Sequence, residues 1–157
     1  MISKENVKKL KQTFKEFEKE LEKDPEAEKV KRDTKMWVDD TGIIHIELSG
    51  DMDSMMKYSE IMMNYSEKNK DKIIPSLEIR TLTKLPPILK MPSLKYRKRM
   101  AESLKGSEMN IKFQKMALCE GGVIAKTVLS FILTALGMKN VKHFKTEEKA
   151  LKWLKEE

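Results

Sequence analysis

The sequence predicts an α/β protein: a mixed, mostly parallel sheet of about five strands covered by helices, preceded by an N-terminal amphipathic helix. Two observations lead to this class. Short runs with a hydrophobic period of two alternate along the chain with longer runs of helical period, which is typical of strands joined by crossover helices. An Asp/Gly-rich turn at 39–42 joins the first two of these short runs and predicts a hairpin. The expected order after a linker is β-β-α-β-α-β-α-β-α.

Length and composition fit one domain with an appendage. The chain has 157 residues, 39% of them hydrophobic and 36% charged, as in a soluble protein. A single cysteine excludes an internal disulfide framework and suggests a reducing compartment. We see no secretory leader, and the most apolar run, 123–136, is shorter than the roughly 20 residues that span a bilayer. We therefore expect a cytoplasmic protein without a membrane span.

An amphipathic helix is predicted at 3–23, within an N-terminal segment 1–24. Its apolar residues step by three and four: Val7, Leu10, Phe14, Phe17 and Leu21. Two heptads are marginally stable alone, so this helix must dock either on the domain's own surface or on a second copy, forming a homodimer. The charged residues 25–33 are interpreted as a linker to a domain at 34–157.

The domain begins with a strand at 35–38 and the stretch 42–54, GIIHIELSGDMDS. Ile44, Ile46 and Leu48 alternate with polar residues, which predicts a strand with one face against a core. Gly50 ends that strand, and Asp51 or Asp53 is suited to cap the next helix. That helix carries apolar residues on one face: Met55, Tyr58, Ile61, Met62 and Tyr65.

The remaining elements follow in alternation. We expect a strand at 73–82 with Pro75 near its start, an extended proline-rich loop, and a helix at 94–105 with Ser93 as its N-cap. A strand at 115–120, an apolar helix at 123–136, a strand at 141–144 and a helix capped by Thr146 complete the domain. The helix 123–136 is apolar on nearly all sides, so it is either buried or part of an interface.

Positive charge is concentrated in residues 84–115. This segment contains two acidic residues and nine basic ones: Lys84, Lys90, Lys95, Arg97, Lys98, Arg99, Lys105, Lys112 and Lys115. Such a patch could attract an acidic protein, a phosphate or nucleic acid, or could simply be a solubilising surface. Because only Tyr96 and Phe113 could stack on bases, nucleic acid is the unlikely partner.

Three segments carry a resemblance to a known family: ELSGDMD at 47–53, KMALCEGG at 115–122 and KHFKTEEKALKWLKEE at 142–157. Over 34–157 the chain resembles the STAS family (sulfate transporter and anti-sigma factor antagonist domains), in particular its SpoIIAA-like branch. The resemblance implies a non-enzymatic regulatory module. In the classical members a partner kinase phosphorylates a serine at the start of the helix after the third strand, and this controls docking. The equivalent position here is near Ser93, with Thr81 and Thr83 just upstream, in a proline-rich basic loop.

Two functional hypotheses follow. In the first, the loop and helix 84–105 dock an acidic protein partner, as in an anti-sigma factor antagonist, through Lys90, Ser93, Lys95, Arg97 and Lys98. Phosphate on Ser93 would meet a helix N-terminus and neighbouring cations, although capping alone also explains this serine. In the second, the domain carries or senses a small apolar or lipid-like ligand, as the resemblance allows, between helices that contribute Met55, Met62, Val128 and Phe131.

No catalytic or metal site is predicted. Cys119 continues an apolar strand and is expected to be buried, and His45 and His143 lack other ligands at metal-binding spacing. Asp51 and Asp53 are explained by capping. We therefore expect no enzymatic activity and no cofactor.

Overall fold

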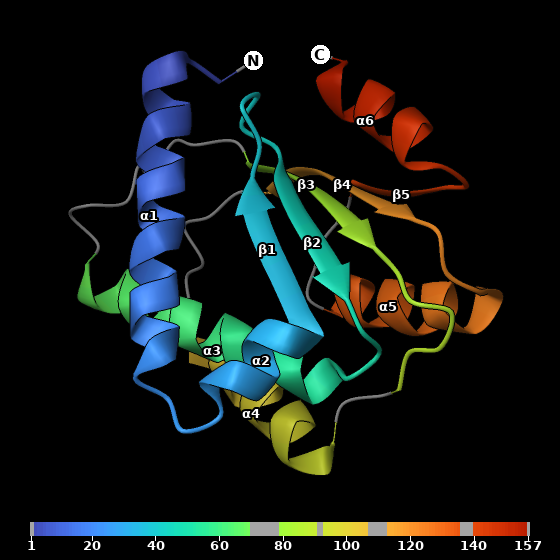
Figure 1. The fold of residues 1–157 in the computed structure, drawn as a ribbon. Coiled ribbons are helices and arrows are strands. Elements are labelled where there is room, and N and C mark those ends of the chain that lie inside the picture. Colours follow the sequence, from blue (N-terminus) through green and yellow to red (C-terminus); the bar gives the residue numbers. More distant parts are fainter. Residues whose placement is uncertain (1, 70–78, 91–92, 107–112, 136–139, 157) are drawn as a thin grey trace.

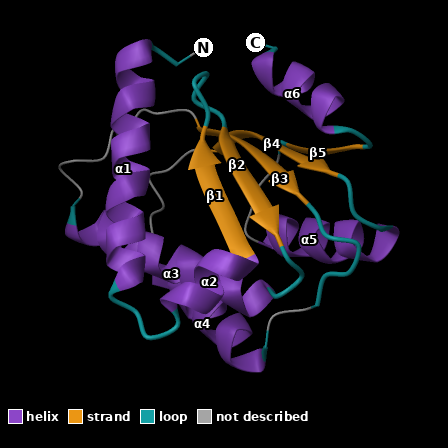
Figure 2. Cartoon of the chain, viewed as in Figure 1, coloured by secondary structure: helices purple, strands orange, loops and turns teal. Residues whose placement is uncertain are grey.

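Five strands form one mixed sheet in the computed structural model, which describes residues 2–69, 79–90, 93–106, 113–135 and 140–156 (Figures 1 and 2). The spatial order follows the sequence: β1 (Thr34–Val38), β2 (Ile44–Leu48), β3 (Ile79–Lys84), β4 (Phe113–Cys119) and β5 (Val141–Phe144). Only β1 and β2 pair antiparallel; the other neighbours are parallel. The predicted α/β class, with its initial hairpin and mostly parallel sheet, is confirmed.

The crossover helices are α3 (Met52–Lys68), α4 (Leu94–Gly106) and α5 (Val123–Ala135). Each joins two adjacent parallel strands in the same direction along the sheet, so right-handed crossovers place all three on one face. The last helix, α6 (Glu147–Lys155), covers the opposite face. Side chains of β4 show this alternation, because Met116 packs in the core beneath α5 and Ala117 packs in the core beneath α6.

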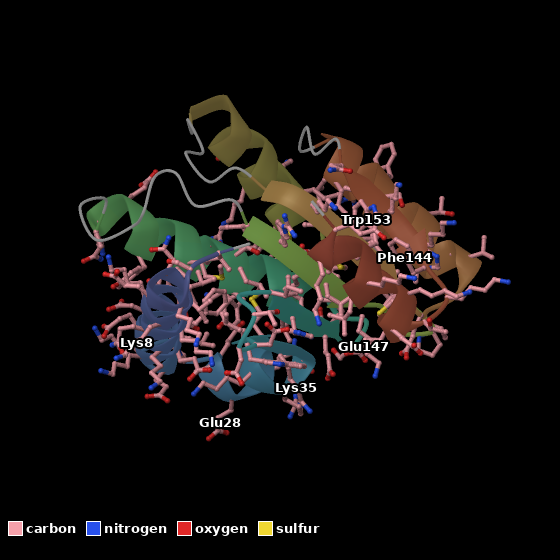
Figure 3. The ribbon with its side chains drawn as sticks, turned by 90° about the horizontal axis from the view of Figure 1, so that it is seen from above. Lys8, Glu28, Lys35, Phe144, Glu147 and Trp153 are labelled. Carbon is pink, nitrogen blue, oxygen red and sulfur yellow. The ribbon has the colours of Figure 1, made fainter. Side chains whose placement is uncertain are left out.

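Helix α6 is held on its face by cations from the sheet. The ammonium of Lys115 donates to the carbonyls of Trp153 (3.0 Å) and Glu156 (2.6 Å), and the guanidinium of Arg80 donates to the carbonyl of Leu154. These carbonyls lie at or just after the carboxyl end of α6, where most carbonyls lack the intrahelical N–H partner that they would have farther inside the helix. Figure 3 shows Phe144 beside Trp153, with ring centroids 5.5 Å apart. The sheet therefore caps α6 as well as packing against it.

The N-terminal helix, α1 (Lys4–Glu22), docks on the domain of its own chain. All five residues of the predicted seam are buried, and they pack against β1, β2 and α3. The Phe17 ring meets the Tyr65 ring edge-on at 5.1 Å. Burial of five such side chains stabilises this position by on the order of 10 kcal/mol as an upper estimate. A homodimer that used the same seam would have to undock α1 first.

Residues 27–33, within the segment 25–33 interpreted as a linker, form a short helix. Helix α2 (Ala27–Asp33) buries Val30 against α3 and α1, and it leaves its charged residues exposed except for Asp33, which is half-buried and accepts the hydroxyl of Ser54 (2.8 Å). An ion pair from Lys31 to Glu22 links α2 to α1, and one from Lys29 to Asp51 links it to the start of α3. Two apolar residues in seven, Ala27 and Val30, are too few to establish a period, which is why the sequence did not reveal this helix.

Strand and helix limits otherwise lie close to the predicted ones. The largest differences are two residues: β3 continues to Lys84 where the sequence predicted an end at 82, and β4 begins at Phe113 where it predicted a start at 115. The first part of that predicted strand, including Pro75, lies outside the described residues.

Candidate docking surface

The turn between β2 and α3 holds the loop that leads from β3 to α4. The backbone N–H of Lys90 donates to the carbonyl of Gly50 (3.1 Å), and the N–H of Ser93 donates to Oδ1 of Asp53 (2.7 Å). Asp51 caps α3 through Oδ1, which accepts from the N–H of Asp53 (3.0 Å). Of the two aspartates predicted as caps, Asp51 caps α3, whereas Asp53 anchors the start of α4.

Glycines at the start of α5 hold the same loop from the other side. The N–H of Leu85 donates to the carbonyl of Cys119 (2.9 Å). A Cβ on Gly121 would lie 2.6 Å from Cβ of Leu85, and one on Gly122 would lie 3.2 Å from the carbonyl oxygen of Pro87. Residues 85–90, 93–99 and 122–124 thus form one continuous surface at the carboxyl ends of β2, β3 and β4. We call it the docking surface; open α/β sheets bind their ligands at this edge.

Four exposed cations of the docking surface have no carboxylate within ion-pair distance among the described residues. They are Lys90, Lys95, Arg97 and Lys98, all in the predicted set. Neighbouring cations do have such partners: Arg99 pairs with Glu60 (3.3 Å) and Lys57 with Asp24 (3.1 Å). The positive charge of the four is therefore available to a ligand.

Ser93 stands immediately before α4, as predicted, and is exposed. Its carbonyl accepts the N–H of Arg97 (3.0 Å), which is the first hydrogen bond of the helix. Thr81 and Thr83, in contrast, are buried within β3. Of these three hydroxyls, only that of Ser93 is accessible to a modifying enzyme in the folded chain.

Large apolar side chains are exposed beside these cations, and sequence reasoning did not assign them to the site. Ile88 is 72% exposed, Leu94 58%, Val123 81% and Ile124 73%. Phe131, farther along α5, is 70% exposed. The only signal in the sequence was the apolar character of the proline-rich loop and of the helix after it. Helix α5 is thus both buried and exposed: Ala125, Leu129 and Leu133 face the core.

The four residues of the hypothetical ligand pocket do not meet in one place. Met55 and Val128 pack against the core beneath α5, Met62 packs beneath α1, and Phe131 is exposed. A hollow of about 400 Å³ lies elsewhere, between the ends of α1 and α3, and is lined mainly by polar residues such as Glu20 and Asn64. The side chains proposed for an apolar ligand are instead core filling or surface.

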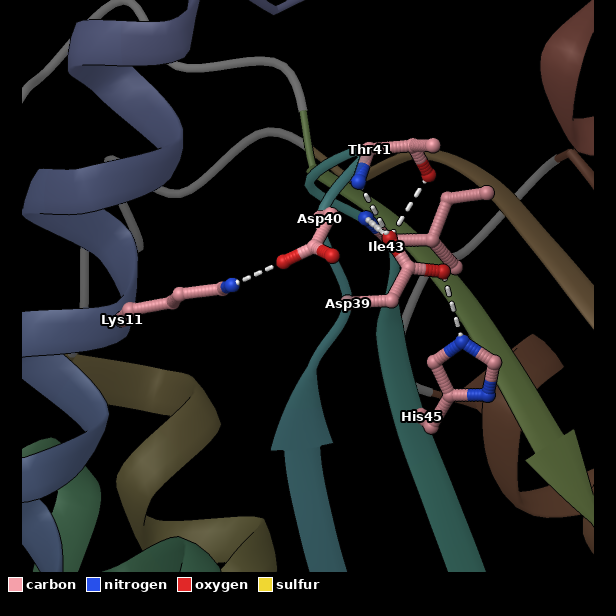
Figure 4. A network of polar contacts seen from close by, with 6 residues as sticks. All are labelled: Lys11, Asp39, Asp40, Thr41, Ile43 and His45. Atoms are coloured by element: carbon pink, nitrogen blue, oxygen red, sulfur yellow. Dashed lines mark hydrogen bonds and ion pairs between the residues drawn. The ribbon is translucent and has the colours of Figure 1, made fainter.

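A cluster of polar side chains around Asp39 stabilises the hairpin turn between β1 and β2 (Figure 4). Oδ1 of Asp39 accepts from the N–H of Thr41 (2.8 Å), its hydroxyl (2.6 Å) and the N–H of Ile43 (3.1 Å), while Oδ2 contacts Nε2 of His45 (2.8 Å). Burial alone would raise the pKa of Asp39, but these hydrogen bonds outweigh it and leave the pKa below its usual value. The rings of Trp37 and His45 are stacked, with their centroids 5.0 Å apart. The cluster thereby closes a turn.

The other singled-out residues also have structural roles. Cys119 is fully buried, and burial raises the pKa of its thiol to about 11, which disfavours a nucleophilic thiolate at neutral pH. His143 contacts the carbonyl of Glu120 through Nε2 (3.1 Å). Within the described ranges, no group of three His, Cys, Asp or Glu side chains is placed to hold a metal ion. None of the helices in those ranges is long and apolar enough to cross a membrane.

Comparison of the chain with protein-family models, curated protein sequences and solved structures found no match.

Proposed function

We propose that this chain is a non-enzymatic, STAS-like regulatory domain that binds an acidic protein partner through its docking surface. One observation carries the proposal. Lys90, Lys95, Arg97 and Lys98 are exposed without carboxylate partners among the described residues, on a loop that is held at both ends and on the helix whose start it anchors.

The fixed backbone favours binding by a physical argument. A loop that is already ordered loses little conformational entropy when a partner arrives, so more of the contact energy contributes to affinity. Hydrogen bonds to Gly50 and Asp53 provide this order from one side, and the close contacts at Gly121 and Gly122 provide it from the other. The unpaired cations then steer an acidic surface toward the site and set its orientation.

Ser93 gives the proposal a means of regulation, as the STAS resemblance implies. A phosphate on this exposed hydroxyl would add about two negative charges among Lys90, Lys95 and Arg97. Asp53 already places a carboxylate at the same point. Phosphorylation would therefore lower the local positive field and weaken binding of an acidic partner.

The test is charge reversal of the docking surface. Lys95→Glu, Arg97→Glu and Lys98→Glu together should abolish capture of the partner from a lysate of the native cells. Because acidic residues are favourable in the first turn of a helix, this triple variant should still fold.

The matched control reverses three exposed lysines elsewhere: Lys8 and Lys15 on α1, and Lys152 on α6. Both triples change the formal net charge from +7 to +1. Capture that survives the control triple and fails with the docking-surface triple supports the proposal. Equal capture by the docking-surface triple and the unmodified chain would refute it.

A further inference from the structure

The docking surface carries exposed apolar side chains as well as unpaired cations. In the sequence, Ile88 precedes Lys90 by two residues and Leu94 precedes Lys95 by one. Val123 and Ile124 follow Gly122, which is in close contact with Pro87 of the loop. Among the described residues, only Phe131 and Trp37 are also large, apolar and exposed. Four of the six large apolar side chains that are exposed among the described residues therefore belong to the segments that make up the docking surface.

The position of Ile88 is imposed by the backbone around it. A Cβ on Gly50 would lie 2.6 Å from the carbonyl oxygen of Ile88, so the loop approaches the β2–α3 turn as closely as a glycine allows. On either side of Ile88, Leu85 and Leu89 are buried in the core. The loop therefore anchors two leucines inward and holds the isoleucine outward in a fixed position.

From this arrangement we infer that the segment bound at the docking surface is an acidic amphipathic helix, with carboxylates beside large apolar side chains. This inference rests on the proposed function and adds the chemistry of the partner. A ligand that offered only negative charge would leave Ile88, Leu94 and Ile124 in water. A helix with apolar residues along one face and glutamates along its flanks would cover the apolar side chains and pair with Lys95, Arg97 and Lys98.

Carboxylates that border the docking surface in the chain favour a protein over an anionic membrane. Glu102 is exposed farther along α4, Glu120 is exposed just before Gly121, and Asp53 bonds to Ser93 at the start of α4. A uniformly anionic lipid surface would repel all three. A folded helix can place lysines or neutral residues opposite them.

The experiment measures binding of three probes to the full chain by fluorescence anisotropy or co-sedimentation. The first is a synthetic helix of about 18 residues, or five turns, with leucine on one face and glutamate on the flanks. The second is a polyglutamate peptide of equal charge. The third is a vesicle of phosphatidylcholine and phosphatidylserine in equal amounts.

Two variants and a control are compared with the unmodified chain. The apolar variant carries Ile88→Ser, Leu94→Ser and Ile124→Ser. The charge variant carries the Lys95, Arg97 and Lys98 reversals. Trp37→Ser is the control, because Trp37 is exposed on β1, away from the docking surface. Thermal melts verify that each protein is folded.

The inference expects the amphipathic helix to bind more tightly than polyglutamate, and to bind the apolar variant roughly tenfold or more weakly. The Trp37 control should bind as the unmodified chain does. Equal binding of the two peptides, no effect of the apolar variant, or binding of vesicles in place of the helix would each overturn the inference. If the charge variant loses binding of both peptides while the apolar variant keeps it, the inference fails and the proposed function stands. If the charge variant binds as well as the unmodified chain, the proposed function itself fails.

Discussion

Replacing Gly50 by alanine would add one methyl group at the contact between the β2–α3 turn and the loop from β3. Gly50 has φ +108°, a backbone conformation that residues with a Cβ rarely adopt. The new Cβ would also lie 2.6 Å from the carbonyl oxygen of Ile88. Since that oxygen belongs to the backbone, no side-chain rotation can relieve the contact, and the loop itself must shift.

The expected cost has two parts. Holding a non-glycine residue in such a conformation costs about 1–3 kcal/mol, and displacement of the loop brings the total to about 2–4 kcal/mol. For a domain of this size each kcal/mol lowers the melting temperature by about 2–4 °C. The variant should therefore melt about 4–16 °C below the unmodified chain.

Circular dichroism melts provide the measurement. Ser49→Ala is the matched control, because Ser49 is exposed in the same turn and its replacement leaves the N–H that donates to Asp33 in place. Its melting temperature should stay within about 2 °C of the unmodified value. If the melting temperature of Gly50→Ala also stays within that range, the close contact between Gly50 and the carbonyl of Ile88 does not hold the loop in place.

Two further predictions concern single residues. The folded-state pKa of Asp39 is below its unfolded value, so its carboxylate stabilises the fold at pH above the unfolded pKa of about 3.9, and this contribution is lost as the pH falls through the folded pKa. Urea unfolding should show Asp39→Ala less stable than the unmodified chain by about 1–3 kcal/mol at pH 7, with a difference that shrinks below pH ~4; a pH-independent difference would contradict this. Because Cys119 is buried and its thiol pKa is raised to about 11, a disulfide reagent should react with it at pH 8 only as the chain unfolds in urea; rapid reaction of the folded chain would show that the thiol is accessible.

Local patterns in the sequence were sufficient for the sheet and its order. Ile44 and Leu48 are buried as their alternation predicts, although Ile46 is half-buried and His45 on the opposite face is buried too, and Asp51 caps α3 as its place after Gly50 indicates. These features depend on residues that are near one another in the chain. The seam of α1 was equally readable, but its two possible partners could be distinguished only once β1 and α3 were seen beneath it.

The composition of the docking surface depended on contacts that no local pattern reports. Asp53 has the sequence position of a cap, yet it bonds to Ser93, 40 residues later. Ile88 and Leu89 are adjacent and chemically alike, but one is exposed and the other buried. That difference arises from the approach of the loop to Gly50 and Gly121. The cations were predictable from charge density alone, whereas their apolar neighbours were not.

The carboxylates nearest the docking surface explain why its cations are unpaired. Asp51 is bound to Lys29, Glu60 to Arg99 and Glu120 to Lys84. Asp53 is bound to the backbone N–H of Ser93, which carries no formal charge. Three of these carboxylates are therefore paired with cations outside the set of four, and the fourth, Asp53, anchors the residue that precedes α4. Asp53 alone among them contributes both to the unpaired charge and to the fixed geometry of the docking surface, so a substitution that removes its bond to Ser93, such as Asp53→Ala, should loosen the start of α4.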